Sequence, residues 1–295
     1  MELKLIEFFQ DYFFQYIIYI LSYAGHLFVV LGFVVILYLA VDKKLGAKAL
    51  TFYFTSMIFN ANLKVWISRP RPYTQGAKTI IENAQQYSMP SGHAQGFAAL
   101  LSPFFIQSKK KLKTGLILGG LLAFLCFTRL YLGQHYLSDV LAGAAIGVAM
   151  AVLLQLVYYF GREKAQLFLL GLIPICILLM AFFNGEEYRD GFVSCGILIG
   201  SLSGIYLEQR FVKYEIKGSF LNRVLKVLFS LAVTSVAITP TVFLRNILNE
   251  NLFLVILFTV MGLSFTLLCP YLIKIVFCRE KLSSEINTSK EQINS

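Results

Sequence analysis

Residues 128–139 read TRLYLGQHYLSD, a polar string set between two long apolar stretches. Two similar strings come earlier, KVWISRPRP at 64–72 and PSGH at 90–93, and with the first they hold two of the chain's three histidines. A charged side chain inside or at the edge of a bilayer is costly, so it is a candidate for function. Strong cations combined with two histidines favour a site for a phosphate ester.

The composition places these strings in a membrane protein. The chain has 295 residues, of which 57% are hydrophobic and only 14% are charged. That balance is typical of a multi-span helical membrane protein and excludes an ordinary soluble domain. The net charge of +10 comes from cations crowded into short loops, as the positive-inside bias expects, so no nucleic-acid partner is predicted.

Apolar stretches near the ~20 residues that cross hydrocarbon predict an all-α, polytopic membrane helical bundle. Residues 3–22 are also apolar, but Glu7 and Asp11 leave open whether they span the membrane or lie in its interface. The clearer predicted spans are 24–41, 47–67, 92–107, 114–131, 138–160, 165–183, 191–207, 226–244 and 252–277.

Cations are concentrated in alternate loops, which predicts the orientation. The cation-rich loops hold Lys43, Lys44 and Lys48, then Lys109, Lys110, Lys111 and Lys113, then Arg162 and Lys164, then Arg210, Lys213, Lys217, Arg223 and Lys226. We expect these loops to be cytoplasmic. All three polar strings then fall on the extracytoplasmic side of an integral membrane protein, which we expect in a bacterial inner or plasma membrane.

The first string supplies two cations at the end of a predicted span. Pro70 and Pro72 stop the helix and force an extended turn, so Lys64 and Arg71 can converge on one anion. Lysine brings a point charge, and arginine brings a planar fork that matches phosphate oxygens. Arg69 is interpreted as a cation that reaches toward the interface, with no part in the site.

The second string opens the next span. Pro90 and Ser91 suit a helix start, Gly92 lets the backbone approach a ligand, and the dipole and N–H groups there favour an anion. His93 would then lie beside the bound anion as a proton donor.

The third string pairs a base with a carboxylate. His135 and Asp139 share a face if HYLSD is helical, so the carboxylate would orient the imidazole for attack on phosphorus. Arg129 ends the preceding span. His26, the third histidine, is interpreted as an interfacial residue. The outer cluster of Glu186, Glu187, Arg189 and Asp190 is interpreted as a solvated loop, with a role in shaping the head-group site as the alternative.

In order, the strings give Lys-x6-Arg-Pro, Pro-Ser-Gly-His and Arg-x5-His-x3-Asp. This arrangement resembles the type 2 phosphatidic acid phosphatase family, the membrane relatives of the vanadium-dependent haloperoxidases. The resemblance covers roughly residues 24–160, and Thr128 stands where the family usually has serine. It implies a haloperoxidase-like helical core and a phosphohydrolase without metal or other cofactor, and the apolar stretches after residue 165 predict additional C-terminal transmembrane helices.

The resemblance also assigns roles to individual residues. His135 would be the nucleophile that forms a phosphohistidine, Asp139 would orient it, and His93 would protonate the leaving oxygen. The phosphate and its transition state would be cradled by Lys64, Arg71, Ser91, Gly92 and Arg129.

Four regions follow from this reading. Residues 1–23 form an apolar N-terminal helix, 24–164 the catalytic core, 165–278 the appended transmembrane helices, and 279–295 a polar cytoplasmic tail that we expect to be disordered.

The expected activity is hydrolysis of a lipid phosphate or diphosphate at the outer face, with membrane lipids as the surroundings. The candidate substrates are a polyprenyl diphosphate, phosphatidylglycerol phosphate, phosphatidate, a sphingoid phosphate or lipid A. One alternative is a lipid phosphotransferase that uses the same phosphohistidine, and another is a non-enzymatic lipid transporter or scaffold with a vestigial site. A haloperoxidase is the weakest reading, and the oligomeric state is left open.

Overall fold

The computed structural model describes residues 15–77, 79, 87–161, 164–183 and 188–277, which form helices and contain no strand. The prediction of an all-α fold is confirmed. The elements are α2 (Gln15–Ser22), η2 (Tyr23–Gly25), α3 (Leu27–Ile36), η3 (Leu37–Val41), α4 (Lys43–Ile67), η4 (Pro72–Gln75), α5 (Gly92–Gln107), α6 (Lys111–Tyr131), α7 (Leu137–Gly161), α8 (Ala165–Phe183), α9 (Arg189–Leu207), η7 (Glu208–Val212), α10 (Phe220–Val242), η8 (Phe243–Asn246), α11 (Glu250–Leu263) and η9 (Ser264–Leu268), with short 3₁₀ and π segments labelled η.

Fewer of these helices than predicted are long and apolar enough to cross a membrane. Among the described residues five pass that test: Lys111–Tyr131, Leu137–Gly161, Arg189–Val212, Phe220–Asn246 and Glu250–Phe277. A sixth span would be the bent pair Ile17–Gly25 and Leu27–Val41, whose halves meet at 58°. The predicted spans at 47–67, 92–107 and 165–183 form helices but do not meet these requirements for length and hydropathy. For α5 the reason is length, because 16 residues fall short of the hydrocarbon thickness.

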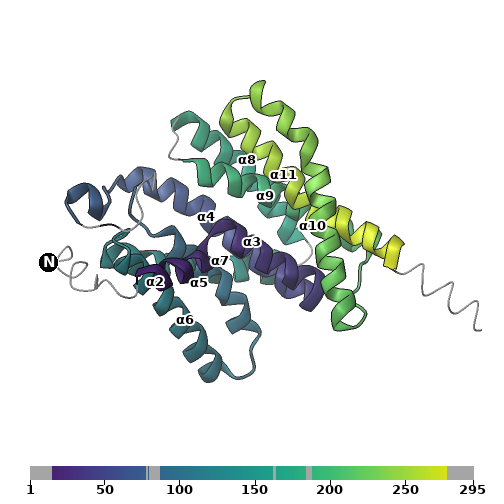
Figure 1. Ribbon diagram of the computed structural model, residues 1–295, viewed down its shortest axis with the longest axis horizontal. Coiled ribbons are helices and arrows are strands. Elements are labelled where there is room, and N and C mark those ends of the chain that lie inside the picture. The colour runs from purple at the N-terminus through teal and green to yellow at the C-terminus, as the bar shows by residue number, and fades with distance from the viewer. Residues whose placement is uncertain (1–14, 78, 80–86, 162–163, 184–187, 278–295) are drawn as a thin grey trace, which may run out of the picture.

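The short helix α5 lies at the centre of the first half, where it packs against α4, α6 and α7 (Figure 1). Its contact with α7 is a contact of backbones. A Cβ atom at Gly147 would lie 2.2 Å from the Gln95 carbonyl oxygen, which no side chain tolerates. Small residues allow such close approach between membrane helices, and this approach holds the first turns of α5 against the first half of α7.

The second half is attached to the first through α9, which packs against both α4 and α11 (Figure 1). Here too the backbones touch, since a Cβ atom at Gly200 would lie 2.0 Å from the Thr259 carbonyl oxygen. A buried ion pair reinforces the attachment: Lys43 at the start of α4 lies 2.7 Å from Glu208, whose carboxylate also accepts the Tyr214 N–H. The later helices are therefore joined to the first half by packing and by charge.

We expect Gly147→Ala to lower the free energy of unfolding by about 1–3 kcal/mol, because the added methyl group overpacks the α5–α7 contact. Gly119→Ala on α6 is the matched control, since a Cβ atom there meets nothing within 4 Å. The control should be neutral or stabilising by up to about 1 kcal/mol. Unfolding in detergent measures both variants, and equal behaviour would contradict the proposed contact.

Candidate active site

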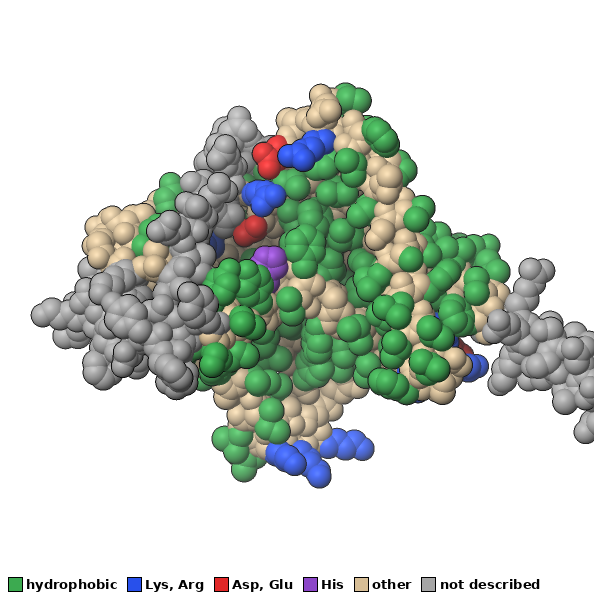
Figure 2. All heavy atoms as spheres, in the orientation of Figure 1, with side chains coloured by type: hydrophobic (Ala, Val, Ile, Leu, Met, Phe, Trp, Pro, Cys, Tyr) green, Lys and Arg blue, Asp and Glu red, His purple; other side chains and the backbone are tan. Residues whose placement is uncertain are grey.

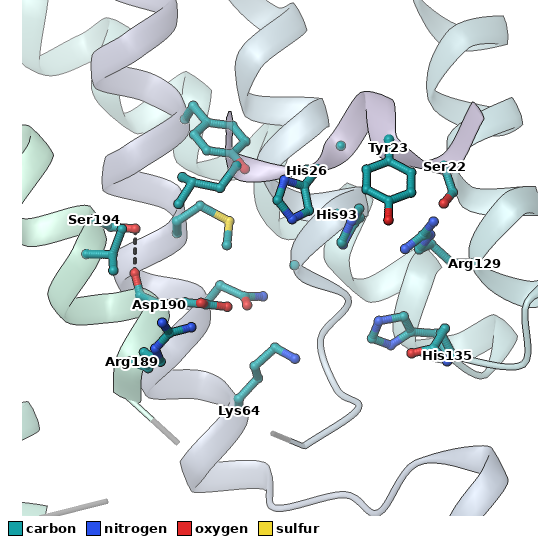
Figure 3. A pocket seen from close by; sticks show the side chains of 18 of the residues that line it. Ser22, Tyr23, His26, Lys64, His93, Arg129, His135, Arg189, Asp190 and Ser194 are labelled. Atoms are coloured by element: carbon teal, nitrogen blue, oxygen red, sulfur yellow. Dashed lines mark hydrogen bonds between the residues drawn. The ribbon is translucent and has the colours of Figure 1, made fainter. Parts of the chain in front are cut away.

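The three polar strings meet around one cavity of about 460 Å³. On the face in Figure 2, histidine, acidic and basic side chains gather in a hollow bordered by hydrophobic side chains. Figure 3 shows His93, Arg129 and His135 on one side of this cavity, with Lys64 pointing in from α4. Lining residues predicted from the sequence are Lys64, Arg71, Gly92, His93, Arg129 and His135.

The first string reaches the cavity because α4 stops abruptly. Its C-cap, Ser68, adopts the left-handed conformation with φ 49°, and the prolines that follow prevent the helix from continuing. Lys64 remains on the last helical turn, where its Nζ donates to the Tyr87 carbonyl oxygen at 2.6 Å. Arg71 lies beyond the turn and donates from Nη1 to the Gln134 carbonyl oxygen at 3.1 Å. The first string is thereby tied to the segments that precede PSGH and HYLSD.

Arg69 corrects the sequence interpretation, which had placed it at the interface. Its Nη1 donates to Asp139 Oδ1 at 2.8 Å and to Ser138 Oγ at 2.7 Å. Its guanidinium group also lies 3.9 Å from the centre of the Tyr136 ring. Only the folded turn brings these groups together, so no sequence spacing could have revealed the contact. Arg69 is a positioning residue that holds the carboxylate of the third string.

The second string starts α5 as expected, with Ser91 as the N-cap residue. Its hydroxyl, however, caps no backbone N–H, and the Ser91 N–H itself donates to the Asp139 carbonyl oxygen at 3.0 Å. Asn60 on α4 holds this start in place by donating to the Pro90 carbonyl oxygen at 3.2 Å and to Gln95 Oε1 at 2.8 Å. The sequence did not predict the contacts of Asn60 and Gln95, since nothing in an apolar helix shows which partner an amide side chain will meet.

The third string forms a turn between α6 and α7. Asp139, in the first turn of α7, is fully buried and accepts the Tyr136 N–H at 2.9 Å, a reach-back contact typical of helix starts. Its Oδ2 lies 3.6 Å from His135 Nδ1. The predicted pair is therefore adjacent, but it is too far apart in this structure for a hydrogen bond.

Burial and the neighbouring cations favour the neutral form of His135. Burial, followed by the positive charges of Arg71, Lys64 and Arg129, lowers the pKa of His135 well below its ordinary value of 6.5. A hydrogen bond with the Ser88 backbone acts on this pKa in the opposite direction but is a smaller effect. A neutral imidazole keeps a lone pair, so this environment suits a nucleophile.

Three buried polar atoms of the predicted site residues have no hydrogen-bond partner within the described part of the chain: Ser91 Oγ, Arg129 Nη2 and His135 Nδ1. Buried donors are normally satisfied, and an anion in the cavity would satisfy Arg129, which lines it, whereas Ser91 is buried behind the lining. In the same described part, no group of three or more His, Cys, Asp or Glu side chains could hold a metal ion. The arrangement is thus suited to bind a tetrahedral oxyanion with side-chain cations.

Other walls of the cavity come from regions outside the three strings. The N-terminal segment contributes Tyr19, Ser22, Tyr23 and His26, and α9 contributes Arg189, Asp190, Val193 and Ser194. His26 thus lies at the cavity as well as between two aromatic rings, those of Tyr23 and Phe28. Of the predicted solvated loop, Glu186 and Glu187 lie outside the described residues, whereas Arg189 and Asp190 line the site.

Comparison with known families agrees with this geometry. Residues 45–164 match the PAP2 superfamily, and residues 192–284 match the PAP2 superfamily phosphatase transmembrane extension. The chain belongs to the PAP2 superfamily. Its apolar helices and the matched extension make it an integral membrane protein.

Several curated phosphatases are similar to the chain. Sphingosine-1-phosphate phosphatase 2 of Homo sapiens is 24% identical over 61% of this chain and 46% of its own length. Phosphatidylglycerophosphatase B of Bacillus subtilis is 30% identical over 37% of this chain and 56% of its own length. Dolichyldiphosphatase of Saccharomyces cerevisiae is 36% identical over 30% of this chain and 42% of its own length. The chain therefore matches about half the length of these relatives.

Among solved structures, a transmembrane PAP2 type phosphatidylglycerolphosphate phosphatase from Bacillus subtilis covers 51% of this chain and 79% of its own. The sequence identity is 23% and the TM-score is 0.44, which is too low to add to the description of this PAP2 fold.

Two arginine variants should separate binding from positioning in this PAP2 site. We expect Arg129→Gln to weaken orthophosphate binding about 10- to 100-fold, since a hydrogen bond to a charged group is lost. Arg69→Gln should lose less affinity but more stability, because it removes the charged partner of the buried Asp139. Calorimetric titration with orthophosphate and thermal unfolding measure the two effects, and the reverse ranking would contradict these roles.

Proposed function

We propose that this protein is an integral membrane phosphatase that hydrolyses a lipid phosphate or diphosphate through a phosphohistidine, without a metal ion. The observation that carries the proposal is the convergence of two histidines and three buried cations on one cavity. Membership of the PAP2 superfamily and the similarity to named lipid phosphatases support the same activity.

The reaction has two steps. The imidazole of His135 attacks phosphorus while the bond from phosphorus to the lipid oxygen breaks, and His93 donates a proton to that oxygen. Water then attacks the phosphohistidine, His93 takes up the proton, and orthophosphate leaves. Since Nδ1 of His135 faces Asp139, the attacking atom is Nε2. Throughout, Lys64, Arg71 and Arg129 stabilise the charge on the phosphoryl oxygens, with Ser91 and the start of α5 as further donors.

The proposed location of the site is the extracytoplasmic side of the membrane, and the distribution of loop cations supports it. Lysines 109–111 and 113 belong to the loop and helix start between α5 and α6, at the end of α5 opposite His93. Basic side chains also gather at that tip in Figure 2. The positive-inside rule puts such a loop in the cytoplasm, and the cavity on the other side.

We also propose a division of the chain into an N-terminal segment 1–23, a catalytic core 24–164, appended helices 165–278 and a tail 279–295. The separation between the two family matches, near residue 164, supports the main boundary. The cavity crosses these boundaries, because α2 and α9 both contribute walls to it.

The phosphohistidine can be tested by single turnover with a phosphate-labelled lipid. We expect His135→Asn to lose at least about 10³-fold in activity, as removal of a nucleophile does elsewhere. With a substrate whose leaving group needs no proton, His93→Asn should form the labelled phosphohistidine but hydrolyse it slowly, so labelled protein accumulates. His135→Asn should accumulate no labelled protein. Full wild-type turnover in EDTA is expected, whereas strict dependence on a divalent cation or an active His135→Asn would refute the mechanism.

The pH dependence offers a further test. Because burial and then Arg71 hold the pKa of His135 below 6.5, this histidine stays neutral when the pH falls through 6.5. The acidic limb of kcat/KM due to His135 should therefore lie below 6.5. In Arg71→Gln one of these causes is removed, so the pKa of His135 should rise and the midpoint of the acidic limb should move to a higher pH, toward 6.5. Lys113→Gln, which changes an exposed cation far from the cavity, should leave the limb in place. An unmoved limb in Arg71→Gln would contradict this account.

A further inference from the structure

The cavity has a second charged wall, and its sign is opposite to that of the phosphate site. Asp190 lies in the first turn of α9 and lines the same cavity as the three cations and two histidines. Figure 3 shows Asp190 on the α9 side, across the cavity from Arg129 and His135. This wall comes from a helix far beyond the motifs in sequence, so the phosphate chemistry does not account for it.

Asp190 is exposed, and within the described part of the chain no cation forms an ion pair with its carboxylate. Its neighbour Arg189 also lines the cavity, but Arg189 Nε lies 3.5 Å from Glu250 Oε1, so a carboxylate already balances its charge. Asp190 therefore adds a negative charge on the α9 wall, while Arg129 lies across the cavity and Lys64 points in from α4. A cavity of this kind favours a ligand with both signs of charge.

We propose that Asp190 binds a protonated amine of the substrate, so that the protein prefers lipid phosphate monoesters that carry an ammonium group a few bonds from phosphorus. A long-chain 2-amino-alcohol 1-phosphate has this chemistry. The proposal rests on the proposed function and adds a selectivity to the same cavity. It also has a repulsive side, because a carboxylate near a second phosphate would disfavour diphosphates and purely anionic head groups.

The N-terminal wall provides neutral hydrogen-bonding groups, which Figure 3 shows beside Arg129. The hydroxyls of Tyr19 and Tyr23 lie 2.7 Å apart, and both residues line the cavity with Ser22. Phenolic hydroxyls both donate and accept hydrogen bonds, so they suit the hydroxyl that an amino alcohol carries beside its amine. The three walls thus match phosphate, amine and hydroxyl groups.

The test compares two substrates that differ only in charge: a long-chain 2-amino-alcohol 1-phosphate and its N-acetylated derivative. Wild-type protein in detergent should show a higher kcat/KM for the free amine. Asp190→Asn should lower kcat/KM for the amine about 5- to 10-fold, mainly through KM, and leave the acetylated substrate unaffected or improved. Glu215→Gln is the matched control, since it makes the same chemical change at an exposed carboxylate that does not line the cavity. In Glu215→Gln the ratio of kcat/KM for the free amine to kcat/KM for the acetylated substrate should equal that of the wild type.

Thermal stabilisation by each lipid, which needs no turnover, keeps the two proposals separate. If neither lipid is hydrolysed but the amine stabilises the wild type more than Asp190→Asn, the proposed function fails and the amine site stands. If both lipids are hydrolysed equally well, or Asp190→Asn loses the same factor with both, the amine site is refuted and the phosphatase stands.

Discussion

The ion pair between Arg69 and Asp139 is the contact on which the arrangement of the site depends. Asp139 joins all three polar strings, because its carboxylate accepts Arg69 from the first, its carbonyl oxygen accepts the Ser91 N–H from the second, and its own string supplies the Tyr136 N–H. A fully buried carboxylate is costly unless several donors surround it. These donors must therefore assemble for the chain to bury Asp139, and their assembly brings the cations and histidines to one place.

The same contact influences the chemistry. Arg69 and the Tyr136 N–H occupy the oxygens of Asp139, and the carboxylate lies 3.6 Å from the His135 ring. The carboxylate is therefore near enough to stabilise an imidazolium electrostatically, yet it does not draw a proton onto His135 before substrate arrives. The positive charges of Arg71, Lys64 and Arg129 oppose that protonation further. A phosphate in the cavity would offset part of this positive charge, so its binding would make His135 more basic as the reaction begins.

The sequence was sufficient to predict that the motif residues lie close together, but it did not reveal which other residues hold them in place. Lys64, Arg71 and His135 were predictable because prolines and helix ends fix their positions within a few residues. Arg69 was misjudged, because a cation in a proline-rich turn gives no sign of which carboxylate it will meet. The membrane span predicted at 92–107 stays a prediction, because α5 has 16 residues and its apolar side chains suit burial between α4 and α7 as well as lipid contact. Asp190 was placed in a solvated loop, since nothing local indicates that α9 packs against α4 and brings its first turn to the cavity.

Close backbone packing explains how helices so distant in sequence can shape one small cavity. At Gly147 and at Gly200 the neighbouring carbonyl oxygen occupies the place of a side chain, so α5 and α7, and likewise α9 and α11, have little freedom to shift. Because α9 packs tightly against α11 and also packs against α4, its first turn is held at the cavity that Lys64 lines. Selectivity for a head group needs such rigidity, since a charge on a mobile wall would adapt to any substrate. The later helices thus have a structural part in the cavity: α9 carries the wall that holds Arg189 and Asp190.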